Sequence, residues 1–371
     1  MQNAVRGRAV LMLPTWYPGP GDPVAGVFVR DQALAIAAHN DVTVLVLEAT
    51  TPSRGRSEVT VADDHGLRTV RVRAAHGPLR KLWLTLALAR GLRVAGRPDL
   101  VHGHVFRVGA VAAVLGRLMR VPVVVSEHHS LFPRRLATRT DLLLARIAFR
   151  GAHVVAPVSE SLREAIEAYG IHARFRVVPN PVDTELFHPG PRAPGDEPVL
   201  LYVGRMAPVK GVPRLLEAAA ELARRGRRFR LVLVGDGPER AHHEALAARL
   251  SLPAEFAGSL ERAEVAARMR AADLLVLASD WETLSSVLLE AQASGLPAVA
   301  PRVGGIPEAL PEAAGVLVAP ADVAALARGI EEALGRDFDR EAIARAVRER
   351  FGAEAVAARW DEVYAEAERV A

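Results

Sequence analysis

The sequence predicts an α/β protein with two doubly wound, parallel-sheet domains, and three observations lead to this expectation. The chain has 371 residues, 50% of them apolar, whereas a single hydrophobic core stops growing at roughly 250 to 300 residues. Short apolar runs typical of buried strands alternate with helical patterns along the chain. Prolines and glycines cluster at 179–198 and divide the alternation into two sets, as expected of a linker.

The expected strands are short runs rich in Val, Leu and Ala. In the first set they lie at 9–13, 42–47, 99–103, 121–126 and 153–159. In the second set they lie at 198–204, 229–235, 272–279 and 297–301. Two parallel strands need a crossover connection, so the helical patterns between these runs predict helices packed on each sheet.

Composition narrows the classes of function. Lys and Arg number 47 against 43 Asp and Glu, a formal net charge of +4, which gives no reason to expect a nucleic-acid partner. The absence of cysteine excludes disulfides, thiolate metal sites and cysteine nucleophiles. No apolar run reaches the roughly 18 residues of a membrane span, and the N-terminus lacks the apolar stretch of a signal peptide. We therefore expect a cytoplasmic protein.

Two glutamates flank the expected start of a helix at 285–294. Glu282 precedes this helix and Glu290 lies inside it. A fully helical interval between them would span about 12 Å, longer than the roughly 5 to 9.5 Å between paired carboxylates of glycoside hydrolases. The start of a helix binds anions, so a phosphate could lie between the two carboxylates. The stretch therefore predicts a site for one elongated ligand whose hydroxyl groups contact the glutamates and whose phosphate lies at the helix start. The alternative is a solvated loop acid, a helix-surface acid and an ordinary N-cap at Thr283 or Ser285.

The stretch 282–310 combines the E-x7-E spacing with EAQASGLPAVA and GGIPE. It closely resembles the donor-binding segment of the retaining glycosyltransferases of family 4, which have the GT-B fold, and the resemblance extends from about Ala9 to the C-terminus. It implies two Rossmann-like domains that face each other across a cleft. The expected divisions are 1–185 for acceptor binding, 186–352 for nucleotide-sugar binding, and 353–371 for a helix that packs back onto the first domain.

This resemblance assigns roles to residues of the second domain. It implies that Glu282 is catalytic and contacts the hydroxyl groups of the donor sugar, while Glu290 binds the nucleotide ribose. The family usually has a Gly-aromatic-Gly run after the first Glu, whereas this chain has Thr283-Leu284-Ser285, which changes the sugar pocket. The further implied donor-side positions are Leu284, Ser285 and Ser286, Leu260 in the AGSL segment that faces the nucleotide base, and Glu308 in GGIPE.

A second motif, GRMAPVKG, follows the strand expected at 198–204. Arg205 and Lys210 lie between that strand and a helix, where two cations can neutralise a diphosphate. The motif resembles the GR-to-KG segment of the same family, which implies that both residues bind the donor diphosphate and stabilise it as a leaving group. Alone, such a pair of cations is more often surface charge.

The loop after the first strand ends in Gly26, directly before a helix expected from Val27. A glycine there lets a phosphate or sugar approach backbone N–H groups. By resemblance, Gly26 matches the loop glycine near the donor phosphate, although it also suits an ordinary strand-to-helix turn. The preceding run, Gly19–Val24, contains two prolines and lacks the third glycine of a dinucleotide fingerprint, so a nicotinamide cofactor is not expected.

Four histidines lie at the ends of two expected strands, as His102 with His104 and His128 with His129. The carboxyl end of a strand is where an open α/β sheet meets its ligand. By resemblance, His128 is an active-site residue that faces the donor sugar, while His104 and His129 are acceptor-side, supporting or structural residues. No carboxylate lies at ligand spacing beside the first pair, so no metal site is expected.

Two helical stretches, 77–97 and 133–150, mix Arg with Leu. Such helices either lie against an anionic membrane, where a lipid-linked acceptor would be found, or cover the core with a solvated basic face. Near the C-terminus, Asp337-Phe338-Asp339 has the form of an Asp-x-Asp metal motif. Because it lies between two helical stretches, we interpret it as a helix cap.

The resemblance implies glycosyl transfer with retention of configuration, from a UDP-, GDP- or ADP-sugar to a glycan, lipid-linked or small-molecule acceptor. No carboxylate nucleophile is evident, so a front-face displacement is expected, without a metal or other cofactor. A non-hydrolysing nucleotide-sugar epimerase has the same architecture and remains an alternative. So does a binding module without activity, although unpaired charged residues in a cleft would destabilise it.

Overall fold

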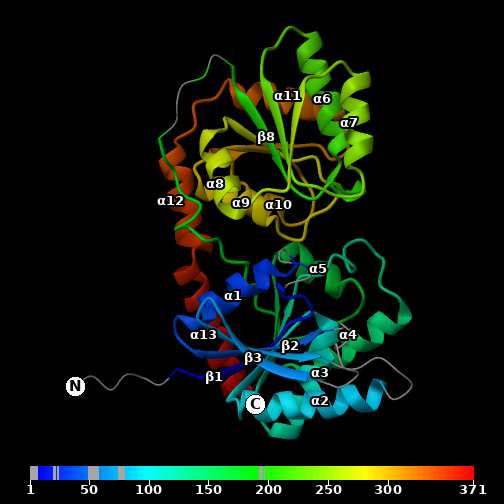
Figure 1. Cartoon of the computed structure of the whole chain (residues 1–371), viewed down its shortest axis with the longest axis vertical. Helices are drawn as coiled ribbons and strands as arrows, with labels where there is room; N and C mark the ends of the chain where they lie inside the picture. Colours follow the sequence, from blue (N-terminus) through cyan, green and yellow to red (C-terminus); the bar gives the residue numbers. More distant parts are fainter. Residues whose placement is uncertain are drawn as a thin grey trace, which may run out of the picture. The chain divides into compact units, whose positions relative to one another are not determined.

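The computed structural model describes residues 7–19, 22, 25–48, 58–73, 80–191, 195 and 197–371. They form two compact units, each with its own sheet. The first unit runs to Pro181 and also includes Ala353–Ala371, whereas the second is the continuous segment Val182–Gly352 (Figure 1). The chain therefore leaves the first unit once and returns to it with its last helix.

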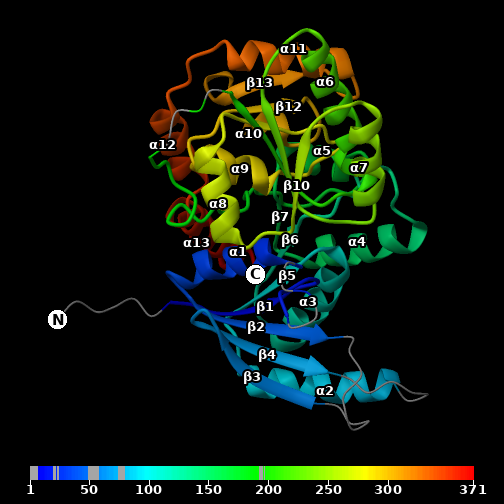
Figure 2. The ribbon, with the colours of Figure 1, turned by 45° about the horizontal axis from the view of Figure 1, so that its top comes forward.

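The first unit is built on a sheet whose strand order, within the described residues, is β3-β4-β2-β1-β5-β6-β7 (Figure 2). Its neighbouring strands run parallel, except that β3 pairs antiparallel with β4. The strands are β1 (Ala9–Leu13), β2 (Asp41–Glu48), β3 (Glu58–Asp64), β4 (Leu67–Arg73), β5 (Leu100–His104), β6 (Val123–Glu127) and β7 (Val154–Pro157). The helices are α1 (Val27–Ala37), α2 (Arg80–Ala95), α3 (Phe106–Met119), α4 (Arg139–Gly151), α5 (Glu160–Glu167) and α13 (Ala353–Val370).

The helices of the first unit cover both faces of its sheet. The chain moves in one direction from β1 to β2 and in the other from β4 to β5, β6 and β7, and right-handed crossovers then place α1 opposite α2, α3 and α4. The C-terminal helix α13 packs against α1, β6 and β7, so it shares the face of α1. The core on that face includes Trp360 and Tyr364, neither of which is exposed to solvent.

The second unit contains a parallel sheet with the order β10-β9-β8-β11-β12-β13, as far as the described residues show. Its strands are β8 (Val199–Val203), β9 (Arg230–Val234), β10 (Ala254–Gly258), β11 (Leu274–Val276), β12 (Ala298–Pro301) and β13 (Gly315–Val318). Its helices are η1 (Pro208–Lys210), α6 (Val212–Arg224), α7 (Arg240–Arg249), α8 (Arg262–Ala271), α9 (Ser286–Ala293), α10 (Ile306–Ala309), η2 (Glu312–Ala314), α11 (Val323–Leu334) and α12 (Arg340–Phe351).

Each sheet has a point at which the strand order reverses. In the first unit it lies between β1 and β5, and in the second between β8 and β11. The expected fold class, two Rossmann-like doubly wound sheets, is confirmed for each unit. In such sheets ligands bind beyond the carboxyl ends of the strands at the reversal. The loops after these four strands are therefore the places to look for a site.

The secondary structure matches the sequence-based expectations, except that the helix expected at 133–150 begins only at Arg139, because Thr138 is its N-cap and accepts a hydrogen bond from the N–H of Asp141. Every expected strand is present, although the run at 272–279 contributes only the short strand β11. Asp339 caps α12 by accepting a hydrogen bond from the N–H of Ala342, so the cap interpretation of Asp337–Asp339 is confirmed. Four strands were not expected from the sequence: β3, β4, β10 and β13.

Three expectations fall partly outside the described residues. The proline-containing run before Gly26 is described only at Gly19 and Asp22. The basic helical stretch from residue 77 is described from Arg80, where α2 begins. The linker expected at 179–198 is described except for 192–194 and 196.

Candidate functional site

Lys210 and Glu282 meet at the point where the second sheet reverses. Lys210 ends η1 in the loop after β8, and Glu282 lies in the loop after β11, the strand that pairs with β8. The Lys210 Nζ is 2.7 Å from Glu282 Oε1, and the Ser279 hydroxyl donates to the same oxygen at 2.9 Å. The pair is only partly accessible, with 29% of the Lys210 side chain and 11% of the Glu282 side chain exposed. The structure thus brings one residue of each motif into contact.

The backbone of Glu282 is held by a close approach of Gly304. A Cβ atom at Gly304 would lie 1.7 Å from the carbonyl oxygen of Glu282, so only glycine fits there. The same carbonyl accepts a hydrogen bond from the N–H of Gly305 at 3.1 Å. The GG of the GGIPE motif therefore fixes the position of the loop that carries Glu282.

Arg205 differs from Lys210 in being unpaired. Its side chain is exposed, and its guanidinium has no hydrogen-bond or ion-pair partner among the described residues. Its carbonyl oxygen accepts a hydrogen bond from the hydroxyl of Tyr202 at 3.2 Å. Tyr202 is buried, and burial together with the Glu282 charge raises the pKa of its hydroxyl, so it remains a donor. Tyr202 thus orients the backbone at Arg205, while the guanidinium remains available to an anion.

The start of α9 lies directly after this loop. Ser285 is the N-cap residue, with φ −80° and ψ 103°, but its side chain makes no capping hydrogen bond. Leu284 and Ser285 are both buried, whereas Ser286 is half-buried. The first N–H groups of a helix have no partner within the helix, so an uncapped start attracts an anion. The geometry fits a phosphate near the backbone of 284–286.

Glu290 lies in the second turn of α9. Its carboxylate is 3.8 Å from the guanidinium of Arg262, the first residue of α8, and 20% of its side chain is exposed. Leu260 is half-buried just before α8, and Glu308 is half-buried in α10. The helix α10 adjoins α9 through a hydrogen bond from the Gln292 side chain to the Ala309 carbonyl. These donor-side candidates therefore lie on elements neighbouring the Lys210–Glu282 pair.

The candidate residues of the first unit gather where its own sheet reverses. His104 is the last residue of β5, and His128 follows β6 directly. Their Nδ1 and Nε2 atoms are 3.3 Å apart, and their rings stack with centroids 5.5 Å apart. Phe28, in the first turn of α1, lies 5.0 Å from the His128 ring. Gly26, which begins α1 in a left-handed conformation, thus belongs to the same neighbourhood.

Burial keeps these imidazoles neutral. It lowers the pKa of His128 to about 3, and burial with the charges of neighbouring imidazoles lowers the pKa of His104 well below its usual value. One ring therefore donates the shared hydrogen bond and the other accepts it. His128 Nδ1 and His104 Nε2 are buried and have no hydrogen-bond partner among the described residues. His128 Nδ1 therefore has a hydrogen-bonding capacity that no described residue uses.

Glu127 is a site residue that sequence reasoning missed. It is completely buried and accepts hydrogen bonds from the backbone N–H groups of Phe106, His128 and His129 at 2.9, 2.9 and 2.7 Å. Burial raises the pKa of its carboxyl to about 7, while the three N–H donors oppose that rise by favouring the carboxylate. Glu127 therefore ties the start of α3 to the loop that carries His128. The only sequence signal was an acid beside two histidines.

His102 serves a structural role. Its ring nitrogens contact the hydroxyls of Tyr364 at 2.9 Å and Ser126 at 2.7 Å, and its ring stacks on His104 with centroids 4.5 Å apart. Tyr364 belongs to α13, so the C-terminal helix supports the histidine cluster. His129 Nδ1 accepts from the N–H of Leu131, which shapes the loop after β6. Within the described ranges, no group of three or more His, Cys, Asp or Glu side chains could hold a metal ion.

Comparison with known proteins adds to this geometry. Residues 183–350 match the sequence model described as Glycosyl transferases group 1, and residues 25–186 match that described as Glycosyltransferase Family 4. The chain is 31% identical to the glycogen synthase of Mycobacterium tuberculosis, over 91% of this chain and 89% of that protein. It is 30% identical to the sulfoquinovosyl transferase SQD2 of Arabidopsis thaliana over 77% of this chain, and it spans 60% of that protein.

A solved structure shows the same fold. The structure of Anabaena HepE, determined in complex with UDP-glucose, superposes with a TM-score of 0.76 and 21% identity. The match covers 96% of this chain and 99% of that one. At this identity the similarity supports the GT-B architecture of paired Rossmann-like sheets. It does not identify the ligand of this chain, which has to be inferred from the residues of its own site.

Proposed function

The chain belongs to the group 1 glycosyl transferases of family 4, and from this membership we propose that it is an enzyme that transfers a sugar from a nucleotide-diphosphate sugar to an acceptor hydroxyl, with retention of anomeric configuration. The observation that carries the proposal is the arrangement in the second unit. There a free guanidinium, a lysine paired with a carboxylate and an uncapped helix start converge at the end of β8 and β11.

This arrangement suits the two ends of a nucleotide-sugar. Arg205, Lys210 and the start of α9 supply positive charge for a diphosphate. Glu282 can accept hydrogen bonds from sugar hydroxyls with its Oε2 atom, which has no partner among the described residues. Glu290 can accept them from a ribose. The UDP-glucose complex of HepE supports a nucleotide-sugar ligand for this fold.

We propose a front-face displacement for the transfer. The bond between the anomeric carbon and the diphosphate oxygen breaks, while the acceptor oxygen bonds to the same carbon on the same face. The acceptor proton passes to the departing diphosphate, whose charge Arg205, Lys210 and the α9 start stabilise. Glu282 is a poor nucleophile for a covalent intermediate because Oε1 is occupied by Lys210 and Ser279. We propose that no metal ion takes part, because Arg205, Lys210 and the start of α9 already supply positive charge to neutralise the diphosphate.

We assign the acceptor side to the first unit, and we keep for two of its residues the roles that the family resemblance implies. Neutral His128 is proposed to hydrogen-bond a hydroxyl of the donor sugar, since its Nδ1 has no partner among the described residues. Gly26 is proposed to let backbone N–H groups at the start of α1 approach the donor phosphate. The acceptor class proposed is a glycan, a lipid-linked sugar or a small molecule with a free hydroxyl, and the protein is proposed to act in the cytoplasm.

The donor site can be tested by thermal shift with UDP, GDP, ADP and their sugar conjugates, in the presence of a chelator. One nucleotide diphosphate and its sugar should raise the melting temperature of the wild-type protein, because a ligand that binds only the folded state stabilises it. Arg205→Gln should reduce the shift, with donor affinity about 10-fold lower. Arg224→Gln changes the same charge at an exposed position of α6 and is the matched control.

Two outcomes would contradict the proposal. If no nucleotide diphosphate stabilised the protein, or if both arginine variants behaved alike, the donor site would be placed wrongly. For the stereochemistry, NMR of the product formed from an α-linked donor should show an α-linkage, and a β-linked product would exclude retention.

A further inference from the structure

Positive charge is concentrated in one segment of the chain. Residues 80–151 carry thirteen Arg and Lys against three Asp and Glu, a net charge of +10, whereas the whole chain has only +4. The rest of the chain is therefore net negative. This segment comprises α2, α3 and α4, the helices on one face of the first sheet, together with β5 and β6.

The three acids of this segment do not neutralise its outer surface. Glu127 is fully buried beneath α3. Asp141 is buried and is bonded to Thr138 and Arg107. Asp99 accepts a hydrogen bond from the backbone N–H of Ala9. The field at the outer surface of the three helices is therefore set by arginines.

Apolar side chains lie exposed among these arginines. On α3, Val111, Val114 and Leu118 are 37%, 54% and 74% exposed and lie on one stripe of the helix. On α4, Leu143 and Ile147 are 58% and 43% exposed and lie one turn apart. The two helices pack against each other, with Gly109 close to Ala148 and Ala113 close to Gly151, and each stripe faces solvent. Water therefore contacts a run of branched aliphatic side chains on an otherwise basic surface.

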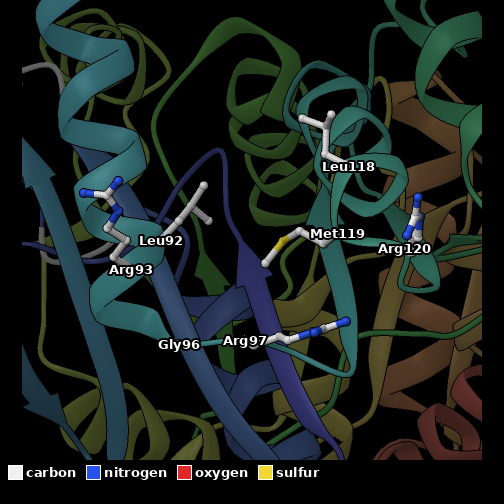
Figure 3. Close-up of a pocket in the computed structure, with 7 residues that line it drawn as sticks. All are labelled: Leu92, Arg93, Gly96, Arg97, Leu118, Met119 and Arg120. Atoms are coloured by element: carbon white, nitrogen blue, oxygen red, sulfur yellow. The ribbon is translucent and has the colours of Figure 1, made fainter.

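A hollow of about 590 Å³ separates the ends of α2 and α3 (Figure 3). Leu92 and Met119 lie on opposite sides of it, and Arg93, Arg97 and Arg120 line its rim. None of these three guanidiniums has an ion-pair partner in the part of the chain that the structure describes. Three arginines without an ion-pair partner beside two apolar side chains match the chemistry of a phosphate headgroup joined to acyl chains, although the Arg93 guanidinium points away from Leu92 and Met119 (Figure 3).

We propose that this surface, the outer face of α2, α3 and α4 with the hollow at its edge, docks onto an anionic phospholipid membrane. We call it the basic face. Leu118, Leu143 and their aliphatic neighbours would enter the boundary between headgroups and acyl chains, and the arginines would contact lipid phosphates. None of the helices that the structure describes is long and apolar enough to cross a membrane. The contact is therefore peripheral.

Charge selects this occupant over two others. A second copy docked through the same face would oppose two surfaces of like charge, which disfavours self-association. Proteins that bind single-stranded nucleic acid interleave arginines with aromatic side chains, whereas the large apolar residues exposed on α3 and α4, among those described, are aliphatic. The inference concerns where the protein acts and holds whether or not the proposed transfer reaction is correct.

The test is co-sedimentation of the full chain with vesicles of phosphatidylcholine alone or mixed with phosphatidylglycerol, at about 0.15 M ionic strength. Wild-type protein should bind the mixed vesicles and not the neutral ones. The variant R93Q/R97Q/R120Q should bind at least roughly 10-fold more weakly, because each arginine near an anionic surface contributes to affinity. L118S/L143S should also weaken binding, which a purely electrostatic contact would not show.

The variant R224Q/R249Q/R345Q is the matched control, since it removes the same charge from exposed positions of the second unit. It should bind the mixed vesicles like wild type. Equal loss in both arginine variants, or equal binding to neutral vesicles, would overturn the proposal. Loss of vesicle binding when soluble glycerol phosphate is added at the concentration of the lipid phosphate would also overturn it. The protein would then recognise a single headgroup and not a membrane surface. A thermal shift with nucleotide, unchanged in every variant, would separate failure of docking from failure of the donor site.

Discussion

Gly26 illustrates how one backbone position holds a candidate site together. It has a φ of 72°, and a Cβ atom there would lie 2.4 Å from the backbone of Trp16. Gly26→Ala should therefore destabilise the first unit by more than about 3 kcal/mol, because the loop before α1 must move as well as adopt a left-handed conformation with a side chain. Urea unfolding at neutral pH measures this change.

Gly170→Ala is the matched control for this prediction. Gly170 has a φ of 67°, but a Cβ atom there would meet nothing within 4 Å. Only the conformational cost remains, so the loss should be about 1 kcal/mol. Equal losses at the two positions would show that the contact with Trp16 is not the reason for glycine at position 26.

The buried histidines predict acid sensitivity. Burial lowers the pKa values of His102 and His128 to about 3, whereas an unfolded chain titrates near 6.5. Below pH 6.5 these imidazoles bind protons in the unfolded state but stay neutral in the folded state. The free energy of unfolding therefore falls as pH falls from 6.5 toward 3. The slope is about 1.4 kcal/mol per pH unit for each such imidazole. Urea unfolding at a series of pH values should show it.

Glu127 acts in the opposite direction, and a variant separates the contributions. Its pKa is raised to about 7, so its contribution is present below the unfolded value of about 4.3 and is lost as pH rises toward 7. The histidines outnumber it, so acid should still destabilise the protein overall. His104→Gln should reduce the slope by about one proton, and replacement of His65, which is 66% exposed, is the control. An unchanged slope in His104→Gln would mean that His104 is protonated in the folded protein.

The sequence identified the site residues that lie in spaced motifs, and it missed those whose role depends on a contact in three dimensions. Lys210, Glu282 and Glu290 lie in motifs whose spacing was readable along the chain. Glu127 and Tyr202 act through the three-dimensional contact that each makes, to the start of α3 and to the Arg205 carbonyl. No spacing along the chain encodes such a contact, because its partners come from other elements or from a local turn.

At the scale of elements, strands that are continuous apolar runs were predictable, including β7 at the edge of its sheet, whereas strands interrupted by charged residues, such as β4 (LRTVRVR) inside the same sheet, were not. The central strands are continuous apolar runs, as sheets covered on both faces require. In contrast, β3 (EVTVADD) is half-exposed, carries acids and joins β4 through His65 and Gly66, both with positive φ. That turn lacks the Asn-Gly or Asp-Gly pair that usually marks such a hairpin. The strands β10 and β13 are short and lie at the edges of their sheet.

The helix α13 should stabilise the histidine cluster through one hydroxyl. Tyr364→Phe removes the hydroxyl that contacts His102 Nδ1 at 2.9 Å and leaves this buried nitrogen unpaired. The expected loss is about 1 to 3 kcal/mol, because an unsatisfied buried polar atom keeps its desolvation cost. Urea unfolding measures it. Tyr169→Phe is the control, since the Tyr169 hydroxyl has no partner in the described part of the chain; a similar loss there would refute the assignment.

The whole molecule is organised by a chain that leaves its first unit and returns. The linker composition at 179–198 predicted a division there, and the structure divides the units after Pro181. Sequence periodicity predicted the last helix, but only the family resemblance indicated that it belongs to the first unit. Its apolar face packs against α1 and the first sheet and includes Val356, Trp360 and Val363. Such long-range pairing is not encoded in the helix pattern itself.

This topology predicts an asymmetric effect of truncation. A chain ending at Gly352 keeps the complete continuous segment of the second unit but removes Trp360 and Tyr364 from the core of the first. Deleting large buried side chains costs several kcal/mol each, so the first unit should unfold while the second stays folded. Calorimetry should show one transition lost and one retained, and the retained transition should match that of the isolated fragment 182–352. Removal of only 369–371, which are exposed, should preserve both transitions. Loss of both transitions on truncation at Gly352 would show that the two units do not fold independently.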